Sequence, residues 1–205
     1  HREWMKKAGV DVPMRVIPEY SIPLDGGGSP PADLPERFFL YVGRLSAAKG
    51  VDSLLAAFAQ RPDYPLIVVG EPDGGGPLPL AGSNVRFTGR VPREKLGAYY
   101  AAAEALVFPS ICAETFGLTA AEALSCGTAV IARASGGVQE VVAPDVGTLY
   151  SDEPGLLRDL DRIWSDPTLA QRMGQEGRRR HEQCYTPALY LQRYLDALQE
   201  TRSRV

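Results

Sequence analysis

Short apolar runs recur along the chain and alternate with stretches where apolar residues return every third or fourth position. A strand buried on both faces of a parallel sheet gives a nearly continuous apolar run, because neither of its faces meets water. Six segments are assigned to such strands, at positions 38–42, 66–69, 85–88, 105–108, 129–132 and 147–150. A further short strand is predicted near the N-terminus, at 14–17.

The stretches between these runs predict helices. Residues 51–59 carry Val51, Leu54 and Phe58 on one helical face, and Pro92 suits the first turn of a helix that follows it. Three more helices are predicted toward the C-terminus, at 156–164, 168–184 and 187–201. Alternation of buried strands with helices is typical of an α/β fold, so we expect a Rossmann-like parallel sheet with helices on both faces.

A segment rich in glycine and proline divides the chain. Residues 25–35 contain three consecutive glycines and three prolines, which leave little to bury and predict a linker. We place this linker at 19–36, after a short N-terminal segment at 1–18. The main domain is expected over 37–183, and residues 184–205 are expected to form a separate C-terminal helix.

Composition narrows the class of protein. Lysine and arginine number 22 against 25 acidic residues, so the net charge of −3 does not indicate nucleic acid binding. Neither a transmembrane run nor a secretory signal is evident, and because the chain begins with His1, we expect an excised fragment or a processed product. Three cysteines without metal-ligand spacing indicate free thiols in a reducing, cytoplasmic setting and predict no metal site. They are Cys112, Cys126 and Cys184.

The stretch 109–130 holds two glutamates, Glu114 and Glu122, with seven residues between them. Thr115 is a plausible N-cap for a helix that would contain Glu122. The backbone N–H groups at the start of a helix have no partner within it, and the helix dipole adds positive charge there. Such an end can hold a phosphate group. The first helical residues would be Phe116, Gly117 and Leu118.

The spacing of the two glutamates matches the size of a sugar nucleotide. Eight residues of helix rise roughly 12 Å. Glu122 could then meet a ribose, the helix end a diphosphate, and Glu114 the attached sugar. The alternative is that both glutamates are solvated and share this spacing by chance.

A second candidate element follows the first strand, where ligands bind in open parallel sheets. Gly43 and Arg44 open this loop, and Lys49 and Gly50 end it. Arg44 and Lys49 could clamp a diphosphate, one with a planar set of donors and the other with a compact charge. Alternatively both are surface residues, and Gly43 serves only a tight turn. The glycine-rich residues 70–76 lack the spacing of a dinucleotide-binding motif.

Together these motifs resemble a known family. Glu-Thr-Phe-Gly-Leu at 114–118 and Glu-Ala-Leu-Ser-Cys-Gly at 122–127, with the loop at 43–50 upstream, resemble the donor-binding half of retaining GT-B glycosyltransferases. This is the large glycosyl transferases group 1 family, which includes sucrose synthases and bacterial mannosyl- and glucosyltransferases. The resemblance covers about residues 37–185 and implies the C-terminal half of a GT-B fold. Residues 1–18 would then be a remnant of the N-terminal acceptor domain, to which the C-terminal helix would cross back.

The resemblance also implies roles for single residues. Arg44, Lys49 and Glu114 would be catalytic, and the backbone around Arg90 and Val91 would face the nucleotide base. The donor-binding set implied by the family is Gly43, Arg90, Val91, Thr115, Phe116, Gly117, Leu118 and Glu122. The family motif Pro-Asn-Gly-Val-Asp is absent here, where residues 18–20 are Pro-Glu-Tyr.

The implied activity is transfer of a hexose, with retention of configuration, from a UDP-, GDP- or ADP-linked sugar to a sugar or lipid acceptor bound by the N-terminal domain. No cofactor is expected besides the donor. The pathway would be polysaccharide or glycoconjugate biosynthesis, and the full enzyme could associate peripherally with a membrane. Two alternatives stay open: a GT-B-like nucleotide-sugar epimerase or phosphorylase, and a nucleotide-sugar-binding module that is inactive alone.

Overall fold

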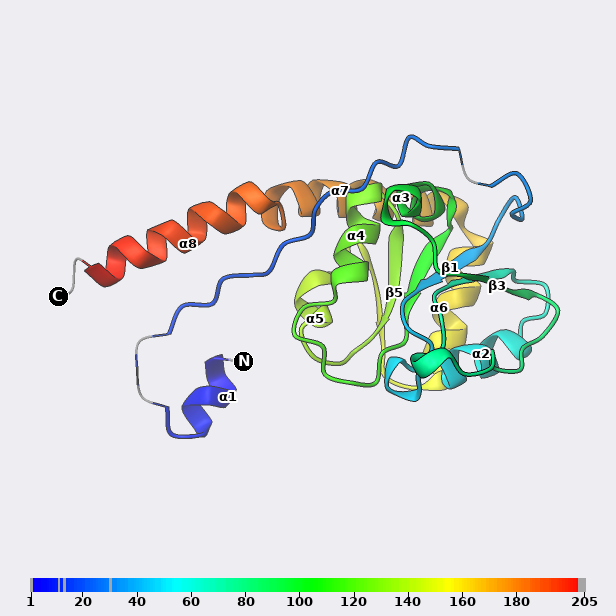
Figure 1. Cartoon of the computed structure of the whole chain (residues 1–205), viewed down its shortest axis with the longest axis horizontal. Coiled ribbons are helices and arrows are strands. Elements are labelled where there is room, and N and C mark those ends of the chain that lie inside the picture. The colour runs from blue at the N-terminus through cyan, green and yellow to red at the C-terminus, as the bar shows by residue number, and fades with distance from the viewer. Residues whose placement is uncertain (1, 11, 13, 30, 203–205) are drawn as a thin grey trace.

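Six parallel strands form one sheet at the centre of the main domain (Figure 1). The structure is a computed structural model, and it describes residues 2–10, 12, 14–29 and 31–202. The strands are β1 (Phe39–Val42), β2 (Leu66–Val69), β3 (Val85–Gly89), β4 (Ala105–Phe108), β5 (Ala129–Arg133) and β6 (Gly147–Tyr150). All five neighbouring pairs are parallel, which confirms the predicted fold class and the six strands of the main domain.

The strand order, β3-β2-β1-β4-β5-β6, reverses direction at the centre of the sheet. The chain proceeds outward from β1 through β2 to β3, then returns to place β4 on the other side of β1. The connections that leave β1 and β4 therefore start side by side at the carboxyl edge of the sheet and then run toward opposite sides of it. In open parallel sheets a crevice forms at such a reversal, outside the carboxyl ends of the strands.

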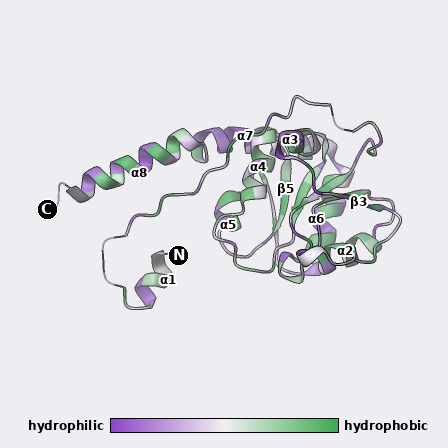
Figure 2. Cartoon of the chain, viewed as in Figure 1, coloured by the Kyte–Doolittle hydropathy of each residue, from purple (hydrophilic) through white to green (hydrophobic). Residues whose placement is uncertain are grey.

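Helices cover both faces of the sheet. The helices of the described residues, including α1 and α8 that lie away from the sheet, are α1 (Arg2–Lys7), η1 (Ala47–Lys49), α2 (Val51–Ala59), η2 (Asp73–Gly75), α3 (Arg93–Ala102), α4 (Leu118–Cys126), α5 (Val138–Val141), α6 (Glu153–Ser165), α7 (Pro167–Cys184) and α8 (Pro187–Arg202). Because side chains alternate along a strand, β1 sends Leu40 into one core with α3 and α4 and Phe39 into another with α2 and α6. Figure 2 shows the resulting apolar character of the strands at the centre of the domain.

Two local predictions are wrong. Residues 14–17 form irregular chain rather than a strand. Helix α4 begins at Leu118, two positions after the predicted start at Phe116.

The expected linker lies against the domain instead of hanging free. Ser21 is buried, its N–H donates to the Tyr185 carbonyl at 3.0 Å, and its hydroxyl lies 2.8 Å from Nε2 of His181. Burial lowers the pKa of His181 below its ordinary value. The segment around Ser21, which precedes β1, is thereby fixed against the C-terminal end of α7.

Helix α8 extends away from the sheet domain (Figure 1). Arg15 pairs with Glu200 on it at 2.7 Å, and the rings of Tyr20 and Tyr190 lie 4.9 Å apart. Several of its apolar side chains stay largely exposed, namely Leu191, Tyr194, Leu195 and Leu198. The predicted division into 1–18, 19–36, 37–183 and 184–205 stays a prediction, and residues 1, 11, 13, 30 and 203–205 lie outside the described residues. Across the described ranges, the helices are all too short or too polar to cross a membrane.

Candidate functional site

The loops after β1 and β4 are pressed together at the central crevice. Gly50, which ends η1, has a left-handed backbone with φ of 72°, and a Cβ atom there would lie 2.0 Å from the carbonyl oxygen of Pro109. Only glycine fits this contact. The N–H groups of Ile111 and Cys112 donate to the Ala48 carbonyl at 3.1 and 3.2 Å. This close approach sets the neighbouring Lys49 against the loop after β4.

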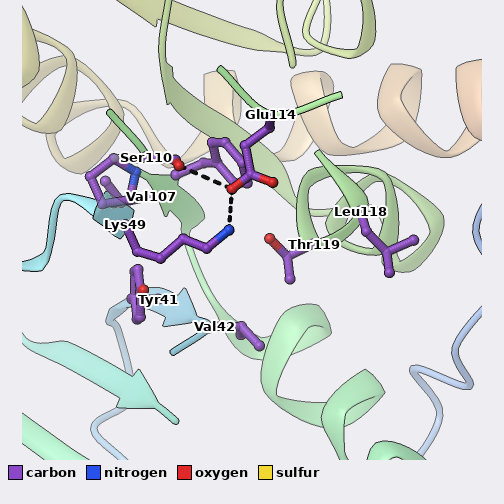
Figure 3. A pocket seen from close by; sticks show the side chains of 11 residues that line it. Tyr41, Val42, Lys49, Val107, Ser110, Glu114, Leu118 and Thr119 are labelled. Carbon is purple, nitrogen blue, oxygen red and sulfur yellow. Dashed lines mark hydrogen bonds and ion pairs between the residues drawn. The ribbon is translucent and has the colours of Figure 1, made fainter. Parts of the chain in front are cut away.

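Lys49 and Glu114 meet in the pocket between these loops (Figure 3). The Lys49 ammonium donates to Oε1 of Glu114, and the hydroxyl of Ser110 donates to the same oxygen at 3.0 Å. Both charged side chains are partly buried. Tyr41 lines the same pocket, and its pKa is raised, chiefly by burial and then by the negative charge of Glu114. The pocket thus presents a carboxylate whose position is fixed by two donors.

The start of α4 differs from the prediction because Gly117 takes a left-handed conformation. Its φ is 99°, and a Cβ atom would lie 3.0 Å from the Val138 side chain. Phe116 turns into the core, and Thr115 is not the N-cap. Leu118 and Thr119 are therefore the first residues of the helix, and their N–H groups have no partner within it. Both residues line the pocket that contains Lys49.

A third loop holds the backbone that carries Glu114. The N–H of Gly137, in the loop after β5, donates to the Glu114 carbonyl at 2.6 Å. A Cβ atom on Gly137 would lie 2.1 Å from the Thr115 carbonyl oxygen. Glu114 is therefore positioned by three loops, those after β1, β4 and β5.

Glu122 lies inside α4, as predicted, but its side chain is only 3% exposed. Oε1 accepts from the guanidinium of Arg93, and Oε2 accepts from the Tyr100 hydroxyl at 3.1 Å. Burial and the charge of Glu122 raise the pKa of Tyr100 well above its ordinary value. Arg93 donates a second bond to the Ile22 carbonyl at 3.1 Å. Sequence reasoning missed Arg93, although its place at the start of the helix after β3 could have drawn notice.

A second pocket adjoins the first. It contains Arg93 and the irregular segment before α4, and it shares Glu114 and Leu118 with the pocket around Lys49. The other residues along its wall are Glu19, Tyr20, Ser21, Ile22, Thr115, Phe116 and Gly117. The two pockets together flank the N-terminus of α4.

The structure brings some predicted residues together and separates others. Gly43 lines the pocket of Lys49, whereas Arg44 points elsewhere, 71% exposed and paired with Asp73 at 3.2 Å. Arg90 and Val91 follow β3 and line a different pocket, between the linker and α3. Among the described residues, His, Cys, Asp and Glu side chains form no group of three that could hold a metal ion.

Comparison with known proteins gives the family. A model described as glycosyl transferases group 1 matches residues 29–180. D-inositol 3-phosphate glycosyltransferase of Segniliparus rotundus is 33% identical over 162 residues, which are 71% of this chain and 36% of that protein. The protein of the same name from Frankia alni is 37% identical over 156 residues, 65% of this chain and 38% of that protein. The chain spans little more than a third of the length of these curated relatives.

Solved structures agree. Sucrose-phosphate synthase from Thermosynechococcus elongatus superposes with a TM-score of 0.83 at 33% identity, over 98% of this chain and 56% of that one. HepE from Anabaena, solved with UDP and glucose, has a TM-score of 0.68 at 23% identity, covering 80% of this chain and 48% of that one, and this likeness concerns the fold alone. The chain belongs to the glycosyl transferases group 1 family and has the fold of a GT-B domain.

Proposed function

We propose that this chain is the donor-binding domain of a retaining glycosyltransferase. The complete enzyme transfers a hexose from a nucleotide-diphosphate sugar to an acceptor held by a separate N-terminal domain. The observation that carries this proposal is the convergence of the Lys49 ammonium, the Ser110 hydroxyl and the N-terminus of α4 around the Glu114 carboxylate. Family membership supports it, and so does HepE, a protein of the same fold that has been solved with UDP-glucose.

The diphosphate of the donor is assigned to the cations and backbone amides at this edge. An ammonium has three N–H donors, so Lys49 can hold a phosphate oxygen while it keeps its bond to Glu114. Arg44 reaches the same oxygens by giving up Asp73, because an exposed ion pair contributes only about 0–1 kcal/mol. The N–H groups of Leu118 and Thr119 add the end of the helix dipole. These groups stabilise the negative charge that develops on the leaving diphosphate.

The sugar is assigned to Glu114, whose carboxylate accepts hydrogen bonds from hydroxyl groups near the reacting carbon. Ser110 and Lys49 fix the direction in which this carboxylate points. The proton of the incoming acceptor hydroxyl passes to a phosphate oxygen of the donor, on the face that the diphosphate leaves, which retains the configuration. The protein thus contributes position and charge stabilisation.

The nucleoside is assigned to the other end of α4, toward Glu122 and the loop that carries Arg90 and Val91. Thr115, Phe116 and Gly117 carry the backbone between the sugar and nucleoside ends, and Gly43 lets the chain after β1 approach the donor. UDP-, GDP- and ADP-linked sugars are the candidate donors, with a sugar or lipid as acceptor and the donor as the only small molecule required. We place the complete enzyme in the cytoplasm, with peripheral attachment to a membrane where the acceptor is a lipid.

Calorimetric titration tests the proposal directly. UDP-glucose, UDP-N-acetylglucosamine, GDP-mannose and ADP-glucose are titrated into the chain, each beside its free nucleoside diphosphate. One of the nucleoside diphosphates is expected to bind the parent chain. The affinity for the nucleotide sugar with the same base is expected to differ between Glu114→Gln and the parent. Failure of all four donors and all three diphosphates to bind contradicts the proposal. Turnover is expected only when the chain is joined to its acceptor domain.

A further inference from the structure

We propose that Arg93 closes the ribose site over Glu122 and so determines how strongly the domain discriminates ribose from deoxyribose. The inference rests on the proposed function, in which the nucleoside lies toward Glu122, and deepens it. Ribose hydroxyl groups bond to the Glu122 carboxylate only after the Arg93 guanidinium has left it. Arg93 is thus a specificity-determining residue that acts by competition with the ligand.

The first observation is that Glu122 has almost no free surface. Its side chain is 3% exposed, and its oxygens Oε1 and Oε2 accept hydrogen bonds from Arg93 and Tyr100, respectively. The pocket beside the N-terminus of α4 is lined by Arg93 but not by Glu122, which lies behind it. A carboxylate that accepts bonds from two ribose hydroxyls needs room beside its oxygens, so one of the present neighbours of Glu122 has to move.

Arg93 is the neighbour that can move. Its side chain is 47% exposed, whereas Tyr100 is fully buried and packs in the core. A guanidinium that swings away from Glu122 stays in contact with water. A Tyr100 hydroxyl that left the carboxylate would stay buried without a partner, which is strongly unfavourable. The route of a ribose to Glu122 therefore passes through the position of Arg93.

The departure of Arg93 has a free-energy cost that the ligand has to supply. The ion pair with Glu122 is lost, and so is the bond of 3.1 Å from Arg93 to the Ile22 carbonyl in the segment before β1. Ribose hydroxyls return two hydrogen bonds to the carboxylate but bring no positive charge. The measured affinity for a ribonucleotide is lowered by the fraction of molecules in which Arg93 still covers Glu122.

The test uses recognition of the ribose hydroxyls as its readout. UDP, GDP and ADP are titrated calorimetrically into the whole chain and its variants, each beside its 2′,3′-dideoxy counterpart, which lacks both hydroxyls. The dissociation constant of the dideoxy form divided by that of the ribose form is called the ribose ratio. An effect of Arg93 on the diphosphate cancels in this ratio.

Arg93→Ala is expected to raise the ribose ratio by about 3- to 30-fold, because one partly exposed charged hydrogen bond no longer competes. Arg93→Gln can still donate an uncharged bond to Glu122, so its ratio is expected to lie between those of the parent and Arg93→Ala. It serves as the test where Arg93→Ala does not fold, as judged by thermal melting. A ribose ratio that is unchanged or lower in the folded variants overturns the inference.

Glu122→Gln tests whether the effect passes through the carboxylate. In the Glu122→Gln background, Arg93→Ala is expected to leave the ribose ratio unchanged, because the guanidinium no longer has an ion pair with which ribose must compete. The double variant also removes both charges, so no buried charge is left unpaired. A rise as large in this background as in the parent background overturns the proposed competition.

Arg86→Ala is the matched control. Arg86 is 44% exposed, pairs with Asp33 and donates to the carbonyl of that residue, so it too ties the chain before β1 to the sheet. It lies outside the pocket of Arg93 and is expected to keep the ribose ratio of the parent. An equal rise in Arg86→Ala would trace the effect to that segment and overturn this inference. Diphosphate binding with unchanged ratios overturns this inference alone, whereas absence of binding by the parent and every variant contradicts the proposed function as well.

Discussion

The ammonium of Lys49 and the carboxylate of Glu114, 65 positions apart in the sequence, form an ion pair at the carboxyl edge of the sheet. Lys49 comes from the loop after β1 and Glu114 from the loop after β4, so the pair joins the two loops that diverge at the strand reversal. The two residues belong to different loops, so neither loop alone can form the ion pair. The pair therefore exists only in the folded domain, and it places a cation and an anion where a charged substrate would enter.

Lys49→Ala and Arg44→Ala separate the two cations that the motifs predict. Lys49→Ala is expected to weaken nucleoside diphosphate binding by about 1–3 kcal/mol, the loss of a charged hydrogen bond. Arg44→Ala is expected to cost less, about 1 kcal/mol, because Arg44 must first exchange Asp73 for phosphate. Calorimetry measures both, and thermal melting should show little change for Arg44→Ala, whose side chain is exposed. A larger loss for Arg44 than for Lys49 would contradict this ordering.

Gly50→Ala is expected to destabilise the domain by more than the cost of its backbone conformation. A left-handed residue with a Cβ atom costs roughly 1–2 kcal/mol, and at Gly50 the new atom also overlaps the Pro109 carbonyl. Gly74 is the matched control: its φ is 71°, and a Cβ atom there meets nothing within 4 Å. Urea unfolding should show a clearly larger loss for Gly50→Ala. Equal losses would mean that the contact between the two loops can relax without cost.

Much of the fold can be predicted from the sequence, because a strand buried on both faces appears there as a continuous run of apolar residues. Thus β2 and β4 occupy the predicted residues, and the helix from Val51 to Ala59 has the predicted bounds. The predicted start of α4 differs because Thr115 is a residue type common at N-caps, whereas the helix begins after Gly117, which is left-handed and lies so close to Val138 that a Cβ atom would meet its side chain at 3.0 Å. Local composition cannot report a contact of this kind.

In the candidate site, too, single residues can be predicted from the sequence, whereas the contacts between them cannot. Glu114 and Lys49 could be named from their motifs, but their pairing depends on how two loops pack. Arg93 and Glu122 are 29 positions apart, and nothing in the spacing between an arginine on one helix and a glutamate on another indicates contact. The sequence predicts Arg44 beside Lys49 because both flank one loop, whereas the structure shows the Arg44 side chain paired with Asp73 in the loop after β2.

The stability of the domain is expected to fall as the pH drops below about 6.5, through His181. This ring is buried, and burial holds its folded pKa below the ordinary value of 6.5. Below that pH the unfolded chain takes up a proton that the folded chain does not, so the free energy of unfolding decreases as the pH falls, and this loss ends below the folded pKa.

Urea unfolding from pH 7.5 to pH 5 measures this effect, with His181→Gln as the comparison. The variant should lose less stability across that range than the parent, because glutamine does not titrate. Its unfolding should otherwise stay cooperative. If parent and variant lose the same free energy over these pH values, other groups carry the dependence.

The two glutamates are expected to divide the donor between them. Glu114→Gln should leave nucleoside diphosphate binding unchanged or slightly tighter, since Lys49 is released to the phosphate, but should reduce the extra free energy that the attached sugar contributes by about 1–3 kcal/mol. Glu122→Gln should weaken the diphosphate and its sugar form equally, because both ligands carry the nucleoside that is assigned to the side of Glu122. Glu104→Gln is the matched control, since Glu104 is a partly buried carboxylate paired with Arg37 outside both pockets. Calorimetry with one nucleotide sugar and its diphosphate measures all three variants. In the complete enzyme, Glu114→Gln should also lower turnover, because the sugar is no longer oriented for attack.

The inverse pattern, with Glu114 affecting the bare diphosphate and Glu122 only the sugar, would place the donor in the opposite direction along α4.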